Sequence, residues 1–512
     1  MRSRLHTEIF LGVAVLITVE LSAQPWVALH PRNRGMGNAG VASAEGGATA
    51  YWNPANLARG SEEMFGFSFK STSVNAHGFV DAAAKGNVIQ VFDELLGLFG
   101  EGGDFEALQA AFDAGTANAE QVKSVFSIID TIADLDDPGN GLTADIGGAM
   151  DIKMGNFAVS YRFISLISGS TFVDTTTSAL ANDGANDLSN VAQGLGADDA
   201  PSNAFAVNEI VPALQGLGLT LQEAQELAFQ AEEALGANIN DADTQELILE
   251  VIGATNLLAG GTLAANESFV LLRGIAMQEI AFAYGLPLFD GKIRVGIAPK
   301  VIVGKTFFQT FDITDSTLND GEDVADELRN VFDKNSETTT RFTIDAGVAW
   351  EPYPFLEFGL GAKNLIPTDF SFKQPTGKNI TIDDFELEPQ LRGGVLLRPL
   401  GWKWLKLTGD FDLTKNSNSL FPGFQERIVG GGVEISPSLW IFQLAIRAGA
   451  FDNVEASGEG LTYTGGLGIR TGIIYLGAQF QIADETIDIE SSGNDVPARA
   501  GFSVNLGINV RF

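Results

Sequence analysis

The sequence predicts an all-β protein: a closed antiparallel transmembrane β-barrel of about 14 strands, with an N-terminal luminal hatch and helical extracellular loops. Three observations support this fold class. Apolar and polar residues alternate in many runs close to the ~9–11 residues that a tilted transmembrane strand needs. The segments between these runs are alternately short and long. After the N-terminal segment, no apolar stretch reaches the roughly 20 residues of a membrane-spanning helix.

The N-terminal residues are predicted to be a secretory signal. Arg2 and Arg4 supply the positive start, residues 9–19 form a short apolar run, and a small residue, Ala23, stands at the expected cleavage site. The run is too short for a membrane-spanning helix. Residues 1–23 are therefore interpreted as a signal peptide. The alternative is an apolar N-terminal strand of a soluble protein.

A segment of small residues precedes the first predicted strand. The stretch RGMGNAGVASAEGGATAYWNPANLA, residues 34–58, lacks strand alternation and is rich in glycine and alanine, which allow close backbone packing. The Asn-Pro pair at 53–54 marks a turn. We expect residues 24–63 to fold back into the barrel as a hatch. Its candidate functional residues are Arg34, Gly35, Gly37, Gly40, Asn53, Pro54 and Ala55.

The barrel is predicted to occupy residues 64–512. Its alternating runs are 64–75, 142–154, 157–172, 273–286, 291–305, 338–351, 355–366, 389–400, 404–415, 426–436, 439–450, 461–471, 473–484 and 499–512. Side chains on a strand point to opposite faces in turn, so each run has an apolar face for lipid. The last run shows this most clearly, with Phe502, Val504, Leu506, Ile508, Val510 and Phe512 on one face. We expect this last strand to close the ring beside the first.

The connections predict the orientation. Short ones hold turn residues such as Gly155-Asn156 and Asp290-Gly291. The long ones are 76–141, 173–272, 306–337, 367–388, 416–425, 451–460 and 485–498. Outer-membrane barrels have short periplasmic turns and longer outer loops, whereas a soluble β-sandwich has no reason to gather its long loops at one end. We expect the outer membrane of a Gram-negative-type (diderm) bacterium, with extracellular long loops and both termini in the periplasm.

The two longest loops, about 76–141 and 173–272, are predicted to be helical insertions. Helical spacing of apolar residues occurs in 88–99, 105–112, 120–135, 219–235 and 244–253. Thr220 and Glu223 have the spacing of a capping box, which satisfies backbone donors at a helix start. These amphipathic, acidic helices are expected to form a cap over the outer mouth of the barrel.

Charged residues stand opposite the apolar face of the predicted strands. A charge at a lipid-facing midplane position costs roughly 2–4 kcal/mol, so these residues are expected to line the lumen. They have mixed signs, which favours structural ion pairs over a selectivity role. The candidate lumen residues are Asp151, Arg162, Arg294, Asp345, Lys363, Arg392, Asp410, Glu434, Arg447 and Arg470.

Two strands show local irregularities. In residues 161–170, apolar residues stand in adjacent pairs, which predicts a β-bulge in the third strand. Residues 430–432 are three consecutive glycines inside a strand, which predicts close packing of the hatch there rather than a phosphate-binding loop.

Composition excludes several functions. The net charge of −34 argues against nucleic acid as a partner, because phosphate binding needs clustered Lys and Arg. The chain has no cysteine, which removes disulfides and thiol chemistry. Beyond the signal it has two histidines, His30 and His77; His77 follows the first predicted strand and is interpreted as an exposed loop residue, with no partner for a catalytic triad. We expect no enzyme activity, no cofactor and no metal site.

Calcium is the alternative to that last expectation. The acidic stretches 134–140, 181–187 and 238–246 offer carboxylate oxygens, which Ca²⁺ prefers. None has the full spacing of an EF-hand loop, so solvated acidic loops are favoured.

The glycine-alanine run ending in NPA resembles the N-terminal hatch of the long-chain fatty acid transporter (FadL) superfamily. More narrowly, residues 34–58, the two helical insertions and KNLIPTDF at 363–370 resemble the conjugal-transfer TraF-like outer-membrane proteins. This resemblance implies a signal peptide, a hatch, a barrel of the size counted here and helical outer loops.

The resemblance implies a gated, porin-like channel that takes up small hydrophobic compounds. The alternative is a structural or assembly component of a conjugal-transfer or surface-interaction system. The expected partners are outer-membrane lipid, a hydrophobic small-molecule ligand, and the barrel assembly machinery, which would recognise the C-terminal strand ending at Phe512.

Overall fold

The structure is a computed structural model. It describes residues 26–60, 71–85, 111, 114, 116–123, 141–172, 185–195, 200–242, 244–245, 248–249, 252, 269–312, 335–376, 380–417, 419–421, 424–439, 441–455, 460–489 and 494–511. The predicted signal peptide, the predicted helix 88–99 and Phe512 lie outside these residues.

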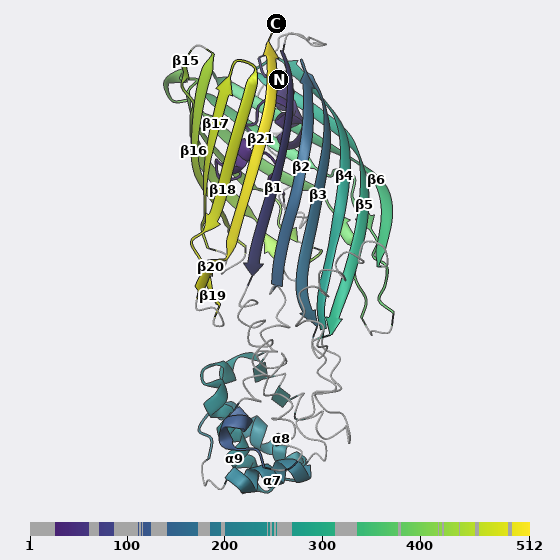
Figure 1. Cartoon of the computed structure of the whole chain (residues 1–512), viewed down its shortest axis with the longest axis vertical. Helices are drawn as coiled ribbons and strands as arrows, with labels where there is room; N and C mark the ends of the chain where they lie inside the picture. The colour runs from purple at the N-terminus through teal and green to yellow at the C-terminus, as the bar shows by residue number, and fades with distance from the viewer. Residues whose placement is uncertain are drawn as a thin grey trace, which may run out of the picture.

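Fourteen long strands of the described chain form one closed antiparallel barrel (Figure 1). In chain order they are β1 (Ser71–Lys85), β2 (Gly141–Met154), β3 (Phe157–Phe172), β4 (Phe269–Leu288), β5 (Ile293–Asp312), β6 (Ser336–Tyr353), β7 (Leu356–Lys363), β10 (Gln390–Leu397), β11 (Leu405–Asp412), β14 (Ile428–Ile435), β16 (Phe442–Asn453), β17 (Thr462–Thr471), β18 (Ile474–Ala483) and β21 (Arg499–Arg511). Each strand pairs with its neighbours in the chain, and the predicted fold class is confirmed.

The ring closes between its first and last strands. Strand β1 pairs with β21 from Ser71 opposite Arg511 to Ala83 opposite Arg499. The expectation that the C-terminal strand lies beside the first strand is therefore confirmed. Closure matters because an open sheet edge would leave unpaired backbone groups in the bilayer, and the closed ring has no such edge.

The apolar faces of the strands point outwards. In β21 the side chains of Phe502, Val504 and Leu506 are 54%, 47% and 53% exposed, whereas Ser503 between them is fully buried. Aromatic pairs stand on this outer surface beside the short turns, as in the stacked rings of Trp402 and Trp404, whose centroids are 5.0 Å apart. Such an apolar band with an aromatic rim is typical of outer-membrane barrels.

Turns and long loops lie at opposite ends of the barrel (Figure 1). At one end, the short-turn end, Gly155, Gly291 and Gly472 adopt positive φ angles of 61°, 75° and 56° in tight connections. The short strand β15 (Ser438–Leu439) pairs with β16 at this end. At the other end, the long-loop end, three loops form small hairpins: β8 (Thr368–Phe370) with β9 (Phe385–Leu387), β12 (Asn416–Ser417) with β13 (Gln425–Glu426), and β19 (Thr486–Ile489) with β20 (Asn494–Pro497).

The predicted bounds of the first strand were wrong. Strand β1 extends to Lys85 and pairs along its length with both β2 and β21, whereas the alternating pattern predicted a strand over 64–75. Residues 64–70 lie outside the described residues. The continuation 76–85 is rich in alanine and glycine, so its apolar signal is weak and two neighbouring ladders hold it in the sheet. His77 is consequently a buried strand residue and not an exposed loop residue.

The predicted bulge in the third strand is also wrong. Strand β3 is paired without a register shift from Phe157 to Gly169 with β2 and to Phe172 with β4. The adjacent apolar residues have another cause: Phe163 faces outwards, while Ile164 and Leu166 are buried against other apolar side chains inside the barrel. This part of the strand is apolar on both faces.

The described helices of the two insertions form a small unit beyond the long-loop end (Figure 1). They include α7 (Ala185–Leu195), η3 (Ala206–Ile210), α8 (Val211–Gly216) and α9 (Leu221–Leu235). The predicted helix at 219–235 and its capping box, formed by Thr220 and Glu223, are confirmed. Among the described residues, no helix has the length and hydropathy to cross a bilayer.

Candidate functional site

The N-terminal residues 26–60, here called the hatch segment, lie inside the barrel. They form α2 (Pro31–Arg34), η1 (Gly46–Ala48), α3 (Thr49–Trp52) and η2 (Pro54–Ala58), short turns of helix that suit a chain rich in small residues. Helix η2 contacts β4, β5 and β6, and α2 contacts β17, β18 and β21. The hatch segment therefore bridges opposite parts of the wall, and most of its residues are buried.

Glycines of the wall make room for the hatch backbone. A Cβ atom added at Gly296 would overlap Pro54 and Ala55, and one added at Gly430 would overlap the carbonyl oxygen of Gly37. Gly432 likewise lies against Met36. The close hatch packing predicted for glycines 430 and 432 is confirmed.

The predicted hatch residues hold the segment through backbone and side-chain hydrogen bonds. Arg34 is buried and donates to Ala28 O at 2.9 Å and to Asp81 Oδ2 of β1 at 3.0 Å. The backbone N–H groups of Gly40 and Val41 donate to Asp410 Oδ2 of β11 at 2.6 and 2.8 Å. A carboxylate that accepts two backbone donors is a strong anchor for a chain without strand pairing.

The Asn-Pro turn has a similar role on the other side. Asn53 accepts a hydrogen bond from Ala55 N at 3.1 Å, which caps η2, and its Nδ2 donates to Val348 O of β6 at 3.0 Å. Pro54 occupies the first turn of η2, where its missing N–H costs nothing. Gly35 lies beside Arg447 and Gln479 of the wall, and Gly37 N donates to Thr464 Oγ1 at 3.0 Å.

Two ion-pair clusters lie near the short-turn end and include hatch residues. Glu434 accepts from Arg32 of the hatch segment and from Arg447 of β16, both at 2.8 Å. Glu357 of β7 accepts from Arg59 of the hatch segment at 2.8 Å and pairs with Arg294 of β5. Each cluster links the hatch segment to two or more wall strands.

Two further clusters lie deeper in the lumen. Arg162 Nη1 donates to Glu279 Oε2 of β4 at 3.2 Å, and Lys300 Nζ lies 3.0 Å from Asp345 Oδ1. Arg392 pairs with Asp412, its neighbour on β11. The ion pairs expected from the mixed signs are therefore present. Removing one partner of such a buried pair leaves an uncompensated charge, which is strongly destabilising.

Aromatic rings of the hatch segment contact these cations. The Nζ atom of Lys363 lies 3.0 Å from the ring centroid of Tyr51 and 4.0 Å from that of Trp26. The guanidinium carbon of Arg162 is 4.9 Å from the Tyr51 centroid, and that of Arg392 is 5.0 Å from the Trp26 centroid. Cation–π contacts thus connect the hatch segment to charges on β3, β7 and β10.

The part of the lumen nearer the long loops is apolar. A buried cluster contains inward residues of β1, β3, β4 and β5 together with residues of the loops that fold inwards: Phe79, Ile164, Leu166, Phe269, Leu271, Ile275, Met277, Ile302, Phe308, Phe370, Phe372, Ile382, Phe385, Leu387 and Leu420. Arg273 Nε donates to Leu420 O at 2.8 Å and fixes one of these loops to the wall. This cluster, here called the apolar lumen, continues onto Trp26 and Leu29 of the hatch segment.

A charged cavity of about 610 Å³ lies on the other side of the hatch segment, near the short turns. Its lining includes Arg32 and Glu45 from the hatch segment and Lys406 and Arg470 from the wall. Arg470 also lies over the ring of Tyr475, with its guanidinium carbon 5.9 Å from the centroid. The hatch segment therefore separates a charged vestibule from an apolar lumen.

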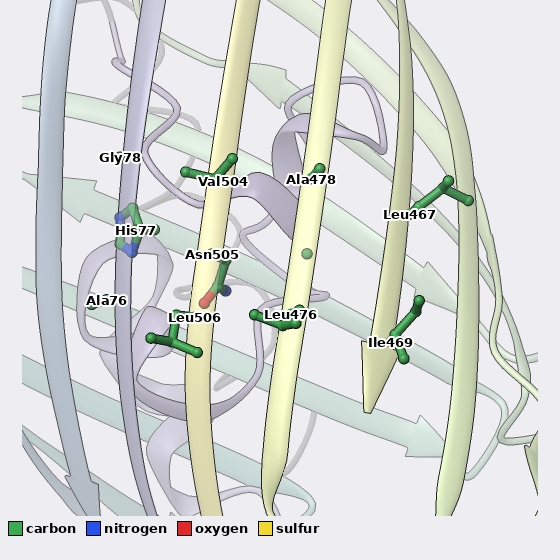
Figure 2. Close-up of a pocket in the computed structure, with 11 residues that line it drawn as sticks. Ala76, His77, Gly78, Leu467, Ile469, Leu476, Ala478, Val504, Asn505 and Leu506 are labelled. Carbon is green, nitrogen blue, oxygen red and sulfur yellow. The ribbon is translucent and has the colours of Figure 1, made fainter. Parts of the chain in front are cut away.

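The wall has a groove on its lipid-facing side, where β17, β18, β21 and β1 run next to one another (Figure 2). The groove has a volume of about 550 Å³ and is lined by leucine, isoleucine, valine, alanine and glycine. The two polar residues in its lining are His77 and Asn505, which are paired opposite each other on β1 and β21. Figure 2 shows the hatch segment behind these strands.

Several partners of the predicted residues were missed from the sequence. Glu279, Lys300, Glu357 and Asp412 all stand on the inward face of strands that were correctly predicted, so alternation alone would have identified them. The sequence alone indicates no partner for His30 of the hatch segment. The structure places it against the wall, with Nε2 2.9 Å from Asp151 Oδ2.

Solved structures that resemble this chain include transporters and channels of aromatic hydrocarbons. The toluene transporter TbuX of Ralstonia pickettii is 11% identical, with a TM-score of 0.41 over 95% of this chain and 98% of that chain. The CymD monoaromatic hydrocarbon channel is 9% identical, with a TM-score of 0.41 over 96% and 99%. A Pseudomonas aeruginosa FadL homologue is 9% identical, with a TM-score of 0.39 over 96% and 100%. Likenesses of this strength leave the function to be argued from the chain's own residues.

A sequence comparison gives the family. No curated protein matches the chain. The sequence model of one family, described as "F plasmid transfer operon, TraF, protein", matches residues 50–412, which extend from the hatch segment to the end of β11. Because this match covers more than half of the sequence, the chain belongs to that TraF family.

Proposed function

We propose that the protein is an outer-membrane channel for small hydrophobic compounds, gated by the hatch segment. The observation that carries this proposal is the division of the lumen. Apolar side chains fill the part near the long loops, and a charged vestibule lies on the far side of the hatch segment. A water-filled pore would have a polar interior throughout.

An apolar lumen gives hydrophobic solutes a favourable environment. Burial of apolar surface contributes roughly 25 cal/mol per Å², so a small aromatic compound would enter in preference to a polar one. The apolar lumen includes aromatic rings, such as those of Phe370 and Phe385, whose centroids are 6.3 Å apart. Aromatic rings pack favourably against one another, so this composition favours compounds that contain a ring.

The hatch segment suits a gate because each of its polar attachments to the wall involves a side chain of at least one partner. Its contacts to the wall are ion pairs, cation–π contacts and hydrogen bonds to single groups such as Asp410, rather than a strand ladder. These contacts can be exchanged one at a time. A displacement of the hatch segment would then join the apolar lumen to the vestibule.

Uptake by whole cells tests the channel. Cells that express the protein should take up a radiolabelled aromatic hydrocarbon faster than cells with empty vector. Phe370→Asp should lower the initial rate of uptake several-fold because it places a charge in the apolar lumen, whereas Phe370→Leu should keep most of the wild-type rate.

Liposome swelling tests the gate. Deletion of residues 26–58 should let liposomes that contain the protein swell in small polar solutes. Uptake equal to the vector, together with no swelling after the deletion, would contradict the proposal.

A second candidate function is assembly or surface interaction. It is favoured by the helical unit, whose own apolar core joins Ala117 and Val122 of the first insertion to helices of the second. A partner that cross-links to the full chain, but not to a variant lacking residues 185–252, would support this function if hydrocarbon uptake is unchanged in that variant.

We also propose the orientation expected from the sequence. Residues 1–23 would be removed as a signal peptide, the long loops would face the cell exterior, and both termini would lie in the periplasm. The position of β21 at the closing seam of the ring supports its recognition by the barrel assembly machinery.

A further inference from the structure

Two histidines and an aspartate meet between the hatch segment and the wall. His30 comes from the hatch segment, His77 from β1 and Asp151 from β2, and one potential ligand atom from each lies within 4.8 Å of the others. The centroids of the two imidazole rings are 4.3 Å apart. All three side chains are buried, with exposures of 3%, 7% and 0%.

The fold places these residues together by register. Asp151 pairs opposite Asn75, two residues before His77, so both side chains point into the lumen from adjacent strands. His30 immediately precedes Pro31, which begins α2, and its extended conformation directs it to the wall. Neither histidine has a near neighbour in the sequence with which it could form a recognisable metal-binding motif.

The imidazole nitrogens are not satisfied by the described part of the protein. Both ring nitrogens of His77 and Nδ1 of His30 are buried without a hydrogen-bond partner there. Buried polar groups are normally hydrogen-bonded, so three unpartnered nitrogens at one place require an explanation. Asp151 is held in place, since its Oδ1 accepts from Ser160 Oγ at 2.5 Å and its Oδ2 lies 2.9 Å from His30 Nε2.

The donor set is that of a transition-metal site. Two imidazole nitrogens and one carboxylate with an open fourth position are a common arrangement for Zn²⁺, with Zn–N distances of roughly 2.0–2.1 Å. His30 also lines the charged vestibule, which offers an entry path and water for the fourth position. The cations nearby have other carboxylates, because Arg34 pairs with Asp81 and Arg162 pairs with Glu279.

We propose that His30, His77 and Asp151 bind one divalent transition-metal ion, with Zn²⁺ the best match to the ligands. The ion links the hatch segment to β1 and β2. Binding itself is independent of transport. Its consequence, a hatch held in the closed position until the ion leaves, rests on the proposed channel function.

Metal binding is measured on the full-length mature protein, purified in detergent and stripped with a chelator. Titration with Zn²⁺ by calorimetry should give one site per chain, and Co²⁺ should give the absorption bands of a low-coordinate site. The chain has no cysteine, and His6 is the one further histidine, inside the predicted signal. No thiolate and no other imidazole of the predicted mature chain would therefore compete. His77→Ala and Asp151→Asn should weaken Zn²⁺ binding at least about tenfold.

A matched control is Asp81→Asn, which removes another wall carboxylate that contacts the hatch segment, through Arg34. It should keep the Zn²⁺ affinity. Gel mobility with and without heating shows whether each variant is a folded barrel, and Zn²⁺ should raise the unfolding temperature of the wild type but not of the double variant His30→Ala/His77→Ala. Sub-stoichiometric Zn²⁺ binding by folded wild type, or equal affinity in that folded double variant, overturns the site.

The same protein in liposomes separates this proposal from the channel. Zn²⁺ should lower hydrocarbon uptake by the wild type and not by the double variant. If Zn²⁺ binds but uptake is unchanged, the closing role of the ion is wrong while the site stands. If uptake occurs and Zn²⁺ does not bind, the site is wrong while the channel stands.

Discussion

Glycine occupies wall positions that the hatch backbone approaches most closely. A Cβ atom at Gly430 would overlap the carbonyl oxygen of Gly37, which is a backbone atom and cannot rotate away. At Gly393 on β10 the nearest atom to an added Cβ would be Leu413 Cδ1 at 3.9 Å, an ordinary contact. Gly430 is therefore needed for the close packing of the hatch segment, whereas Gly393 has room for a side-chain methyl group.

We predict that Gly430→Ala destabilises the seating of the hatch segment. The extra methyl group must displace Gly37, at an expected cost of about 1–3 kcal/mol, which is typical of overpacking. Limited proteolysis should cut residues 26–60 faster than in the wild type, and the unfolding temperature should fall. Gly393→Ala should change stability by less than about 0.5 kcal/mol. Equal behaviour of the two variants would show that the hatch does not need this glycine.

At the scale of elements, α9 shows how a helix begins in a surface unit. Thr220 precedes the helix in extended conformation, and Glu223 accepts from both its backbone N–H and its hydroxyl at 2.8 Å. Glu223 also accepts from Gln193 at 2.7 Å and Ser189 at 2.8 Å, both on α7. One carboxylate therefore joins the start of α9 to its neighbour.

These hydrogen bonds make the unit sensitive to acid. The bond from Gln193, together with those from Thr220 and Ser189, lowers the pKa of Glu223 from 4.5 to about 2. A carboxylate with a lowered pKa stabilises the fold above its unfolded value and loses that contribution as the pH falls through the folded value. The stabilisation is thus complete above about pH 4.5 and is lost towards pH 2.

We predict that Glu223→Gln removes this pH dependence. In hydrogen exchange, corrected for the intrinsic effect of pH, amides in the first turns of α9 should lose protection in the wild type between pH 5 and pH 2. The variant keeps a side-chain acceptor but loses the negative charge at the helix start, so it should be less protected at pH 5 by about 0.3–1 kcal/mol and should change less with pH. Glu209→Gln, at an exposed position of the same unit, serves as the control. A wild-type profile that does not change with pH would contradict the role of Glu223.

At the scale of the whole molecule, the barrel is asymmetric along its axis. The helical unit lies beyond one end of the barrel, the long-loop end (Figure 1). The apolar lumen is near that end, whereas the charged vestibule is near the tight turns of the other end. Strand β1 begins and strand β21 ends at the short-turn end, because Ser71 pairs with Arg511. The asymmetry gives any transported compound two different environments at the two mouths.

The proposed orientation predicts which end is reached from outside the cell. The chain has no cysteine, so a single introduced thiol reports its own position. Val207→Cys in the helical unit, where the side chain is 44% exposed, should react with a membrane-impermeant maleimide on intact cells. Lys403→Cys in a short turn should react only after the outer membrane is opened. The reverse pattern would invert the proposed orientation.

The strand count, the inward or outward direction of most strand side chains and the separation of short turns from long loops follow from the sequence alone. These depend on a period of two residues and on turn chemistry, both local properties of the chain. Alternation failed in β1, where alanine and glycine weaken the signal, and in β3, where Ile164 and Phe163 are apolar on opposite faces. The structure was needed to show that this pattern in β3 marks a strand with two apolar faces and not a β-bulge.

Which inward residues meet also depends on the folded barrel and cannot be read from any one strand. The barrel's register brings Arg162 to Glu279, 117 residues later in the chain, and the return of the hatch segment brings His30 to Asp151, 121 residues later. No local pattern encodes these pairs, because they depend on how far each strand is shifted along its neighbour and on how the hatch segment fills the space that closure leaves.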